Sequence, residues 1–147
     1  MSVDKKNGFT ILELLLVLSL IAIVSAVSFP VFSNFVRQNF VSSAALSVVT
    51  GLEHARSRGL MDMLVPIATF THGTGNYEIA SKSFLLENDY RFSWSSGIDG
   101  SKKAFEFGTK GELLGYPDTQ SLRIFAVQGG ANVFIATTGM ISWSAEN

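Results

Sequence analysis

The chain has 147 residues, 47% of them hydrophobic, which is enough for one domain with a core and excludes an intrinsically disordered protein. The formal net charge is −1, and from Arg37 onward nine Lys/Arg balance ten Asp/Glu, so no broad cationic surface for nucleic acid is expected. The absence of cysteine excludes disulfides, thiolate nucleophiles and zinc–cysteine sites.

The first predicted element is a membrane-spanning helix. Between Glu13 and Arg37 lie 23 residues without a charge, Leu14 to Val36, and about 20 apolar residues suffice to cross a bilayer as a helix. Lys5 and Lys6 precede this run closely, whereas Arg37 stands alone after it. The cation bias therefore places the N-terminus in the cytoplasm and the bulk of the chain outside.

A cleaved secretory signal is the alternative, with an apolar region from Ile11 to Val24 and a small-residue exit at Val24-Ser25-Ala26. Two features argue against it. An acidic side chain inside an inserted apolar helix costs roughly 2.5 to 3.5 kcal/mol, so Glu13 should have a partner. The apolar character also continues well past the exit, to Val36.

A cut between Gly8 and Phe9 would supply that partner. It would create an α-amine four residues before Glu13, and this cation at membrane depth could neutralise the carboxylate of the same helix or of a neighbouring one. Glycine at the cut suits a protease that needs close approach to the backbone.

The stretch Gly8-Phe9-Thr10-Ile11-Leu12-Glu13, followed by an apolar run, resembles the class III signal of type IV pilins and type II secretion pseudopilins. The resemblance implies that a prepilin peptidase cuts after Gly8, removes residues 1–8 as a leader and methylates the amine of Phe9. It implies that Glu13 pairs with the methylated amine of a neighbouring subunit during filament assembly.

The same resemblance implies the location and the partners. The subunit waits in the bacterial inner membrane as a single-pass protein, with a cytoplasmic N-terminus and a periplasmic C-terminal domain. It contacts membrane lipid, the prepilin peptidase and an inner-membrane assembly platform before it joins other pilins or pseudopilins in a helical filament. Its stem, residues 9–36, serves as membrane anchor and later as filament core.

The helix is expected to run from about residue 10 to about residue 58, with a kink at Pro30. Residues 37–59 form an amphipathic half, and Gly59 is expected to end it as a left-handed cap. His54 and Arg56 are predicted to face solvent, since no ligand set surrounds them. The expected packed face recurs at steps of four and three: Val41, Ala45, Val48, Leu52, Ala55 and Gly59.

Residues 60–147 read as a β domain of short segments rich in β-branched and aromatic residues. Pro66 pushes the first strand toward a sheet edge. Gly129-Gly130 and Thr138-Gly139 mark reversals that make the last three strands a meander, and Ser95 to Lys103 form a loop. Strands are expected near Leu64 to Thr71, Asn76 to Ala80, Phe84 to Leu86, Tyr90 to Trp94, Ala104 to Phe107, Leu122 to Val127, Asn132 to Ala136 and Met140 to Trp143.

The fold class is therefore α+β, with a long N-terminal helix packed on an antiparallel β-sheet or sandwich. Three segments resemble those of H-type pseudopilins and FimT/FimU-like minor pilins, namely Leu52 to Gly59, Phe105 to Glu112 and Ala136 to Trp143. The resemblance implies a structural subunit in the tip or priming complex of a type II secretion pseudopilus or a type IV pilus. It implies neither a catalytic role nor a cofactor, and no metal-ligand spacing is present.

A DNA-binding tip protein of the FimT type is the alternative function. Lys102, Lys103, Lys110 and Arg123 could form a local basic patch, although a solvated mixed-charge surface is the favoured interpretation. In several FimT-like proteins arginines implicated in DNA uptake follow the Thr-Gly pair, whereas this chain has Met140-Ile141-Ser142. DNA is therefore an unlikely partner on sequence grounds.

Overall fold

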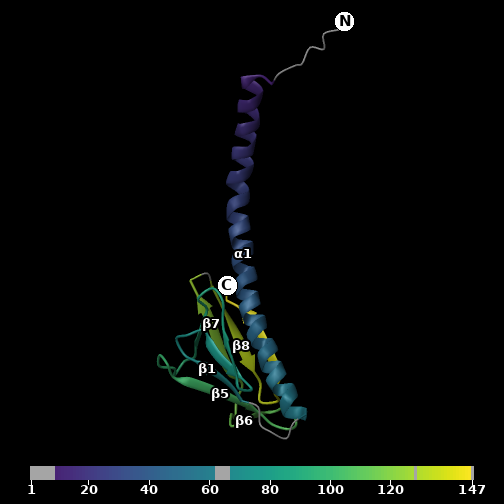
Figure 1. Ribbon diagram of the computed structural model, residues 1–147, viewed down its shortest axis with the longest axis vertical. Helices are drawn as coiled ribbons and strands as arrows, with labels where there is room; N and C mark the ends of the chain where they lie inside the picture. The colour runs from purple at the N-terminus through teal and green to yellow at the C-terminus, as the bar shows by residue number, and fades with distance from the viewer. Residues whose placement is uncertain (1–8, 62–66, 128, 147) are drawn as a thin grey trace. The chain divides into compact units, whose positions relative to one another are not determined.

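The computed structural model describes residues 9–61, 67–127 and 129–146, without the side chains of residues 27 and 30. Gly8, with the rest of the predicted leader, and Pro66 lie outside the described residues. The chain divides into two compact units, Met1–Val36 and Arg37–Asn147. Figure 1 shows one helix, α1, followed by a domain of β-strands.

Helix α1 spans Ile11–Met61, as the sequence predicted to within a turn. Position 30 lies inside the helix, and a kink at Pro30 stays a prediction. The predicted cap at Gly59 is wrong. Gly59 keeps helical backbone and is buried among the residues packed on the domain, so the helix continues to Met61.

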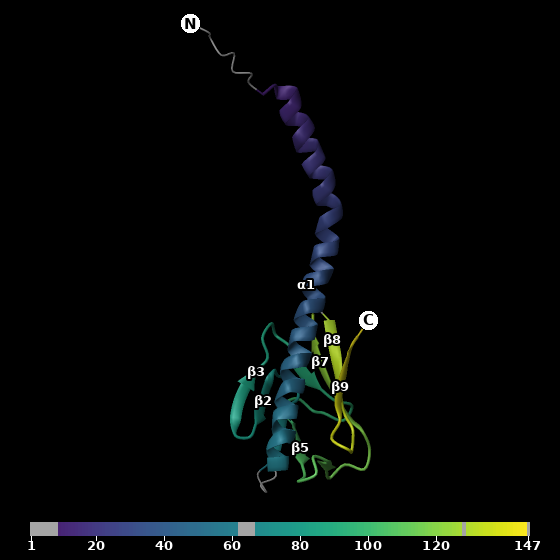
Figure 2. The same ribbon diagram turned by 90° about the vertical axis from the view of Figure 1, so that its right-hand side faces the viewer.

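The C-terminal half of α1 packs on the β domain with the predicted face. Every residue of that face is buried, and Ala44 joins it. Small residues on this face bring the strands close: a Cβ added to Gly51 would overlap Cδ1 of Ile79. Figure 2 shows this half of the helix lying over both groups of strands, with β2 and β3 on one side and β8 and β9 on the other.

The β domain consists of two antiparallel sheets, which confirms the predicted α+β fold class. A bridge between His72 and Phe92 connects the two sheets. The five-stranded sheet has the order β3-β2-β1-β5-β6, with β1 Ile67–Thr71, β2 Asn76–Ile79, β3 Lys82–Leu85, β5 Lys102–Phe107 and β6 Leu113–Leu114. The four-stranded sheet has the order β4-β7-β8-β9, with β4 Arg91–Ser93, β7 Gln120–Ala126, β8 Gly129–Ile135 and β9 Ile141–Ala145.

Two predictions about the first sheet are wrong. Strand β1 lies in the middle of its sheet, between β2 and β5, rather than at an edge. It begins at Ile67, after Pro66, so the missing N–H of the proline removes no bond from the described ladder. Lys102 and Lys103 belong to β5, not to a loop, because they pair with Thr71 and Phe70 of β1.

The second sheet contains the predicted meander, since β7, β8 and β9 are consecutive antiparallel neighbours. Gly139 lies in the turn between β8 and β9 with a φ of 79°, a conformation that favours glycine. The other predicted turn is displaced. Gly129 and Gly130 open β8 and pair with Ala126 and Phe125, so the chain reverses between Ala126 and Gly129.

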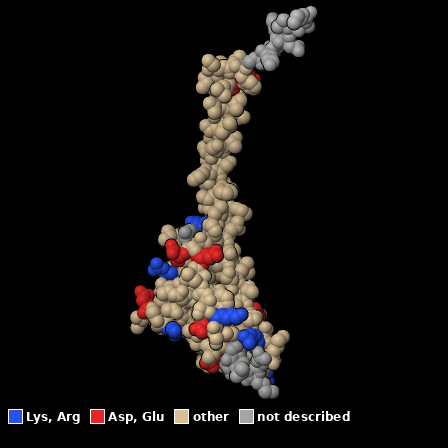
Figure 3. All heavy atoms as spheres, viewed as in Figure 1, with Lys and Arg blue, Asp and Glu red and all other residues tan. Residues whose placement is uncertain are grey.

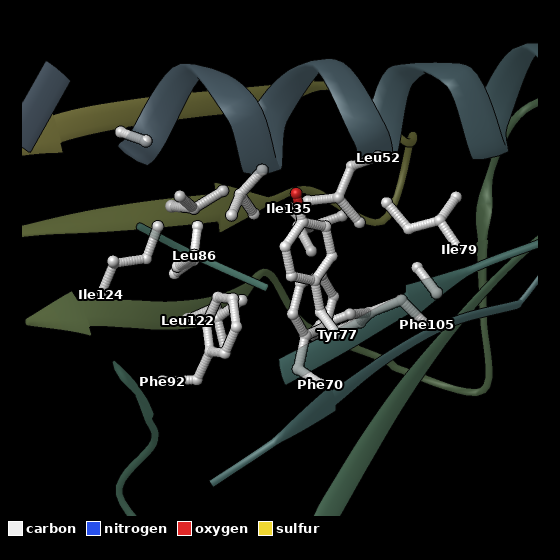
Figure 4. Close-up of a cluster of buried hydrophobic side chains, with 14 of the residues drawn as sticks. Leu52, Phe70, Tyr77, Ile79, Leu86, Phe92, Phe105, Leu122, Ile124 and Ile135 are labelled. Atoms are coloured by element: carbon white, nitrogen blue, oxygen red, sulfur yellow. The ribbon is translucent and has the colours of Figure 1, made fainter. Parts of the chain in front are cut away.

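Aromatic side chains fill the space between the sheets and the helix. The ring of Phe70 contacts those of Phe92 and Phe105 at centroid distances of 4.9 and 5.8 Å, both edge to face. Tyr77 stacks on Phe70 at 5.7 Å. Figure 4 shows Leu52 pointing from α1 toward these sheet residues. This shared core fixes the helix to both sheets.

The three segments that resemble pseudopilin and minor pilin motifs meet at one place, which we call the junction. Nε of Arg56 on α1 donates to the carbonyl oxygen of Gly111, in the β5–β6 turn, at 3.1 Å. Gly139, in the β8–β9 turn, packs directly on that carbonyl. The N–H of Leu113 donates to the carbonyl of Thr137 at 2.9 Å, which joins the two turns a second time.

The junction corrects one expectation about the helix. Arg56 is half-buried and structural rather than simply solvent-facing, whereas His54 is exposed as predicted. Sequence spacing gave no sign of this contact, because 55 residues separate Arg56 from Gly111.

Substitution of Gly139 should test the packing of the junction. Gly139→Ala would place a methyl group on the backbone carbonyl of Gly111 and hold a positive φ, whereas Gly100→Ala shares the positive φ but has no neighbour within 4 Å. We expect a loss of about 1 kcal/mol in unfolding free energy for Gly100→Ala and about 1 to 3 kcal/mol more for Gly139→Ala. Urea unfolding of the detergent-solubilised chain, followed by tryptophan fluorescence, measures both, and equal losses would contradict the assigned contact.

Candidate functional site

The first turn of α1 is capped by the motif that the sequence singled out. The hydroxyl of Thr10 accepts the backbone N–H of Glu13 at 3.2 Å, and the carbonyl of Thr10 accepts the N–H of Leu14, also at 3.2 Å. Thr10 is therefore the N-cap residue and Glu13 the third residue of the helix, the spacing of a capping box. The threonine of the motif thus has a structural function of its own.

The cap places Glu13 and Phe9 at the same end of the helix. The Glu13 carboxylate lies in the first turn, where the helix dipole favours a negative charge. Phe9 directly precedes the cap and is 79% exposed. A cut after Gly8 would therefore leave a free α-amine one residue before Thr10, at the positive end of the helix.

The charge of Glu13 is not balanced within the part of the chain that the structure describes. Its side chain is exposed and makes no ion pair with any residue in the described ranges. A charge of this kind at the end of an apolar helix needs either water or a cation from elsewhere. This is the property expected of a group that pairs with another chain.

The helix surface that follows Glu13 is apolar and uncovered. Side chains from Ile11 to Phe35 are exposed wherever they are described, and by length and composition this helix could cross a membrane. Figure 3 shows acidic atoms at the upper end of the helix and no charged side chain on the visible face between them and the β domain. The hydroxyls of Ser19 and Ser28 donate to the carbonyls of Leu16 and Val24 at 2.7 and 2.9 Å, so these polar groups are satisfied within the helix.

The residues of the alternative basic patch are distributed over both sheets. Lys102 and Lys103 lie at the start of β5, and Lys110 lies in the turn beyond its other end. Five residue steps along β5 alone separate Lys102 from Phe107 by roughly 17 Å. Arg123 belongs to β7 of the other sheet. In Figure 3 basic and acidic side chains alternate over the visible face of the domain.

Two of these cations are engaged in contacts within the domain. Lys103 lies over the rings of Phe105 and Tyr116, and partial burial lowers its pKa. Arg123 donates to both carboxylate oxygens of Glu146 at 2.7 Å, and these bonds hold the pKa of Glu146 below its usual range. Asn132 also donates to Glu146, at 3.1 Å. These contacts hold Lys103 and Arg123 on different sheets of the domain.

The contact between the titratable side chains of His72 and Asp99 was not predicted from the sequence. Nδ1 of His72 lies 3.3 Å from the Asp99 carboxylate, and Trp94 packs edge to face on the imidazole. His72 and Asp99 are 27 positions apart, so the sequence gives no sign of this proximity. Within the described ranges no group of three or more His, Cys, Asp or Glu could hold a metal ion.

Comparison with known proteins identifies the N-terminal segment. Residues 4–29 match the family described as the prokaryotic N-terminal methylation motif. The chain is 37% identical over 59 residues to "Prepilin peptidase-dependent protein D" of Escherichia coli (strain K12), a match that covers 35% of this chain and 40% of that protein. The chain thus aligns with about two fifths of the length of this curated relative.

The fold of about three quarters of the chain matches a solved minor pilin. The crystal structure of the type IV minor pilin FimU from Pseudomonas aeruginosa (PAO1) in space group P21 aligns with a TM-score of 0.58 at 17% identity, over 77% of this chain and 97% of that one. A second crystal form, P65, gives 0.55 at 16% identity, over 72% and 97%. At this identity the likeness shows a shared fold.

The motif and the fold point to the same class of protein. The methylation motif covers the capped helix end with Phe9 and Glu13, and the solved minor pilin shares the long helix packed on antiparallel sheets. Both are features of structural pilins rather than of enzymes. The chain thus carries the prokaryotic N-terminal methylation motif at residues 4–29 and has a fold similar to that of a solved type IV minor pilin.

Proposed function

We propose that the protein is a minor pilin or pseudopilin, a filament subunit that a prepilin peptidase cuts between Gly8 and Phe9 and methylates at Phe9. Before assembly it is anchored in the inner membrane by residues 9–36, with the β domain in the periplasm. One observation carries the proposal: a capped helix end with an unpaired Glu13 precedes an apolar surface that nothing in the described chain covers.

The physics of assembly gives Glu13 its function. Transfer of an apolar helix from lipid into a helix bundle gains little hydrophobic free energy, because lipid tails are as apolar as the bundle. Side-chain packing and polar pairs must then select the axial position of each subunit. A carboxylate without a partner in its own chain, paired with the methylated amine of a neighbour, defines one register among many.

The finer assignment is a place in the tip or priming complex of a type II secretion pseudopilus or a type IV pilus, where the subunit contacts other pilins and the assembly platform. The three segments that resemble H-type pseudopilins and FimT/FimU-like minor pilins support it, because they converge on the Arg56 junction. Their convergence gives a structural reason why three segments far apart in the sequence resemble the same group of proteins together.

Replacement of Gly8 should block processing. A branched side chain at the cut hinders approach of the peptidase to the backbone, so we expect Gly8→Val to accumulate as a precursor that retains residues 1–8 and lacks the methyl group. Intact-mass spectrometry of membranes from cells with an active prepilin peptidase measures this. Gly8→Ala is the steric control and should be cut at least in part. Normal maturation of Gly8→Val would contradict the assigned cut.

Neutralisation of Glu13 should show whether its charge is required for filament assembly. Glutamine also occupies the third position of capping boxes, so Glu13→Gln keeps the cap and the size of the side chain. We expect both Glu13→Gln and Glu13→Leu to be cut and methylated but incorporated into filaments at least tenfold less than wild type. Quantitative immunoblots of sheared filaments measure this, and wild-type incorporation of Glu13→Gln would refute the pairing role.

A further inference from the structure

The end of β7 and the turn residue that follows it form an apolar tip, which we define as Phe125, Ala126 and Val127. Val127 is fully exposed, with a relative accessibility of 103%. Phe125 is half-buried beneath the guanidinium of Arg123, which lies 5.7 Å from its ring centroid. An aliphatic side chain held out at the end of a hairpin has no packing function inside its own domain.

This tip lies beside the residue where the β-domain unit begins. A hollow of about 520 Å³ is lined by Arg37 and Val41 from α1 and by the tip from the other side. A Cβ on Gly129, the residue that pairs with Ala126, would lie 3.3 Å from Cγ2 of Val41. The neighbourhood belongs wholly to the unit Arg37–Asn147, so the tip stays near Arg37 whatever the orientation of that unit.

Arg37 marks the outer boundary of the apolar segment. The uncharged run from Leu14 to Val36 has 23 residues, or roughly 35 Å of helix at 1.5 Å per residue. The hydrocarbon core of a bilayer is about 30 Å thick. A helix that spans it therefore places Arg37, which lines the same hollow as the tip, in the headgroup layer on the far side.

The charges around the hollow suit phospholipid phosphates. Arg37 is exposed and forms no ion pair with the residues that the structure describes. Glu146, the acidic residue lining the hollow, is held by two hydrogen bonds from Arg123, which neutralise it locally. A long cationic side chain can reach phosphate groups while its stem follows the apolar helix.

We propose that the tip and Arg37 form a membrane-contact surface, with Val127 inserted among the headgroups and Arg37 bound to lipid phosphates of the leaflet that the helix leaves. The inference rests on the proposed function, because it requires a subunit anchored in the membrane. Its occupant is the lipid headgroup layer, not a second copy of the chain. Entry into a filament then requires release of this contact as well as extraction of the helix.

The absence of cysteine makes the test direct, because single-cysteine variants of the full chain can each carry one bimane probe. Val127→Cys reports on the tip and Ile21→Cys on the apolar helix. Met140→Cys is the matched control: an exposed apolar residue, it adjoins Gly139 in the β8–β9 turn, at the junction with Arg56. Nineteen residues separate Arg56 from Arg37, roughly 28 Å along the helix.

The variants are placed in nanodiscs of phosphatidylethanolamine and phosphatidylglycerol that hold one chain each, with spin-labelled lipids as quenchers. We expect a headgroup spin label to quench the Val127→Cys probe at least threefold more than the Met140→Cys probe. Addition of Arg37→Glu to Val127→Cys should reduce that quenching at least twofold. Unchanged quenching would overturn the assigned role of Arg37.

The Ile21→Cys probe distinguishes failure of this inference from failure of the proposed function. Quenching of that probe by a mid-chain spin label, together with equal headgroup quenching of Val127→Cys and Met140→Cys, overturns the contact surface and leaves the anchor intact. No quenching of the Ile21→Cys probe overturns the anchor and the surface together. Tip quenching that is absent in nanodiscs and arises only in crowded vesicles identifies a second copy as the occupant, which also overturns the proposal.

Discussion

A single negative charge at the end of a long apolar surface governs this molecule. Glu13 is tolerated in the first turn of α1 because the helix dipole and the Thr10 cap both favour it there. Neither supplies a counter-charge, and neither lipid nor a helix bundle supplies water. In the function proposed above, a cation from another chain supplies that counter-charge, and this one group then links proteolytic maturation to polymerisation.

The β domain holds two sheets and the C-terminal half of α1 in one fixed arrangement. The aromatic cluster around Phe70 lies in the core between the sheets and the helix, but hydrophobic contact does not by itself select one arrangement. The hydrogen bond from Arg56 to the carbonyl of Gly111 is directional, so it fixes the position of the β5–β6 turn relative to the helix. Because Gly139 has no side chain, the β8–β9 turn can pack directly on the backbone carbonyl of Gly111. The junction specifies the geometry that the core stabilises.

The sequence predicted those parts of the structure that depend on local periodicity or on one rigid motif. The buried face of α1 follows from steps of three and four residues, and the β8–β9 turn follows from Thr138-Gly139. Prediction failed for features that are determined by contacts between segments distant in the sequence. The central position of β1 depends on its pairing with β5, and the β2–β3 turn places Ala80 and Ser81 at positive φ without the usual glycine. Strand β6 has two residues, too few for any pattern.

The helix lies on the sheets over several turns rather than at a point, with buried residues from Val41 to Gly59. A force applied along this half of the helix would load the whole helix–sheet interface in shear. Separation would have to slide many side chains past one another at once, whereas a helix held by a few contacts would peel away. The packing that folds the domain thus also resists mechanical separation of helix and sheets, as the proposed extraction of the subunit from a membrane would require.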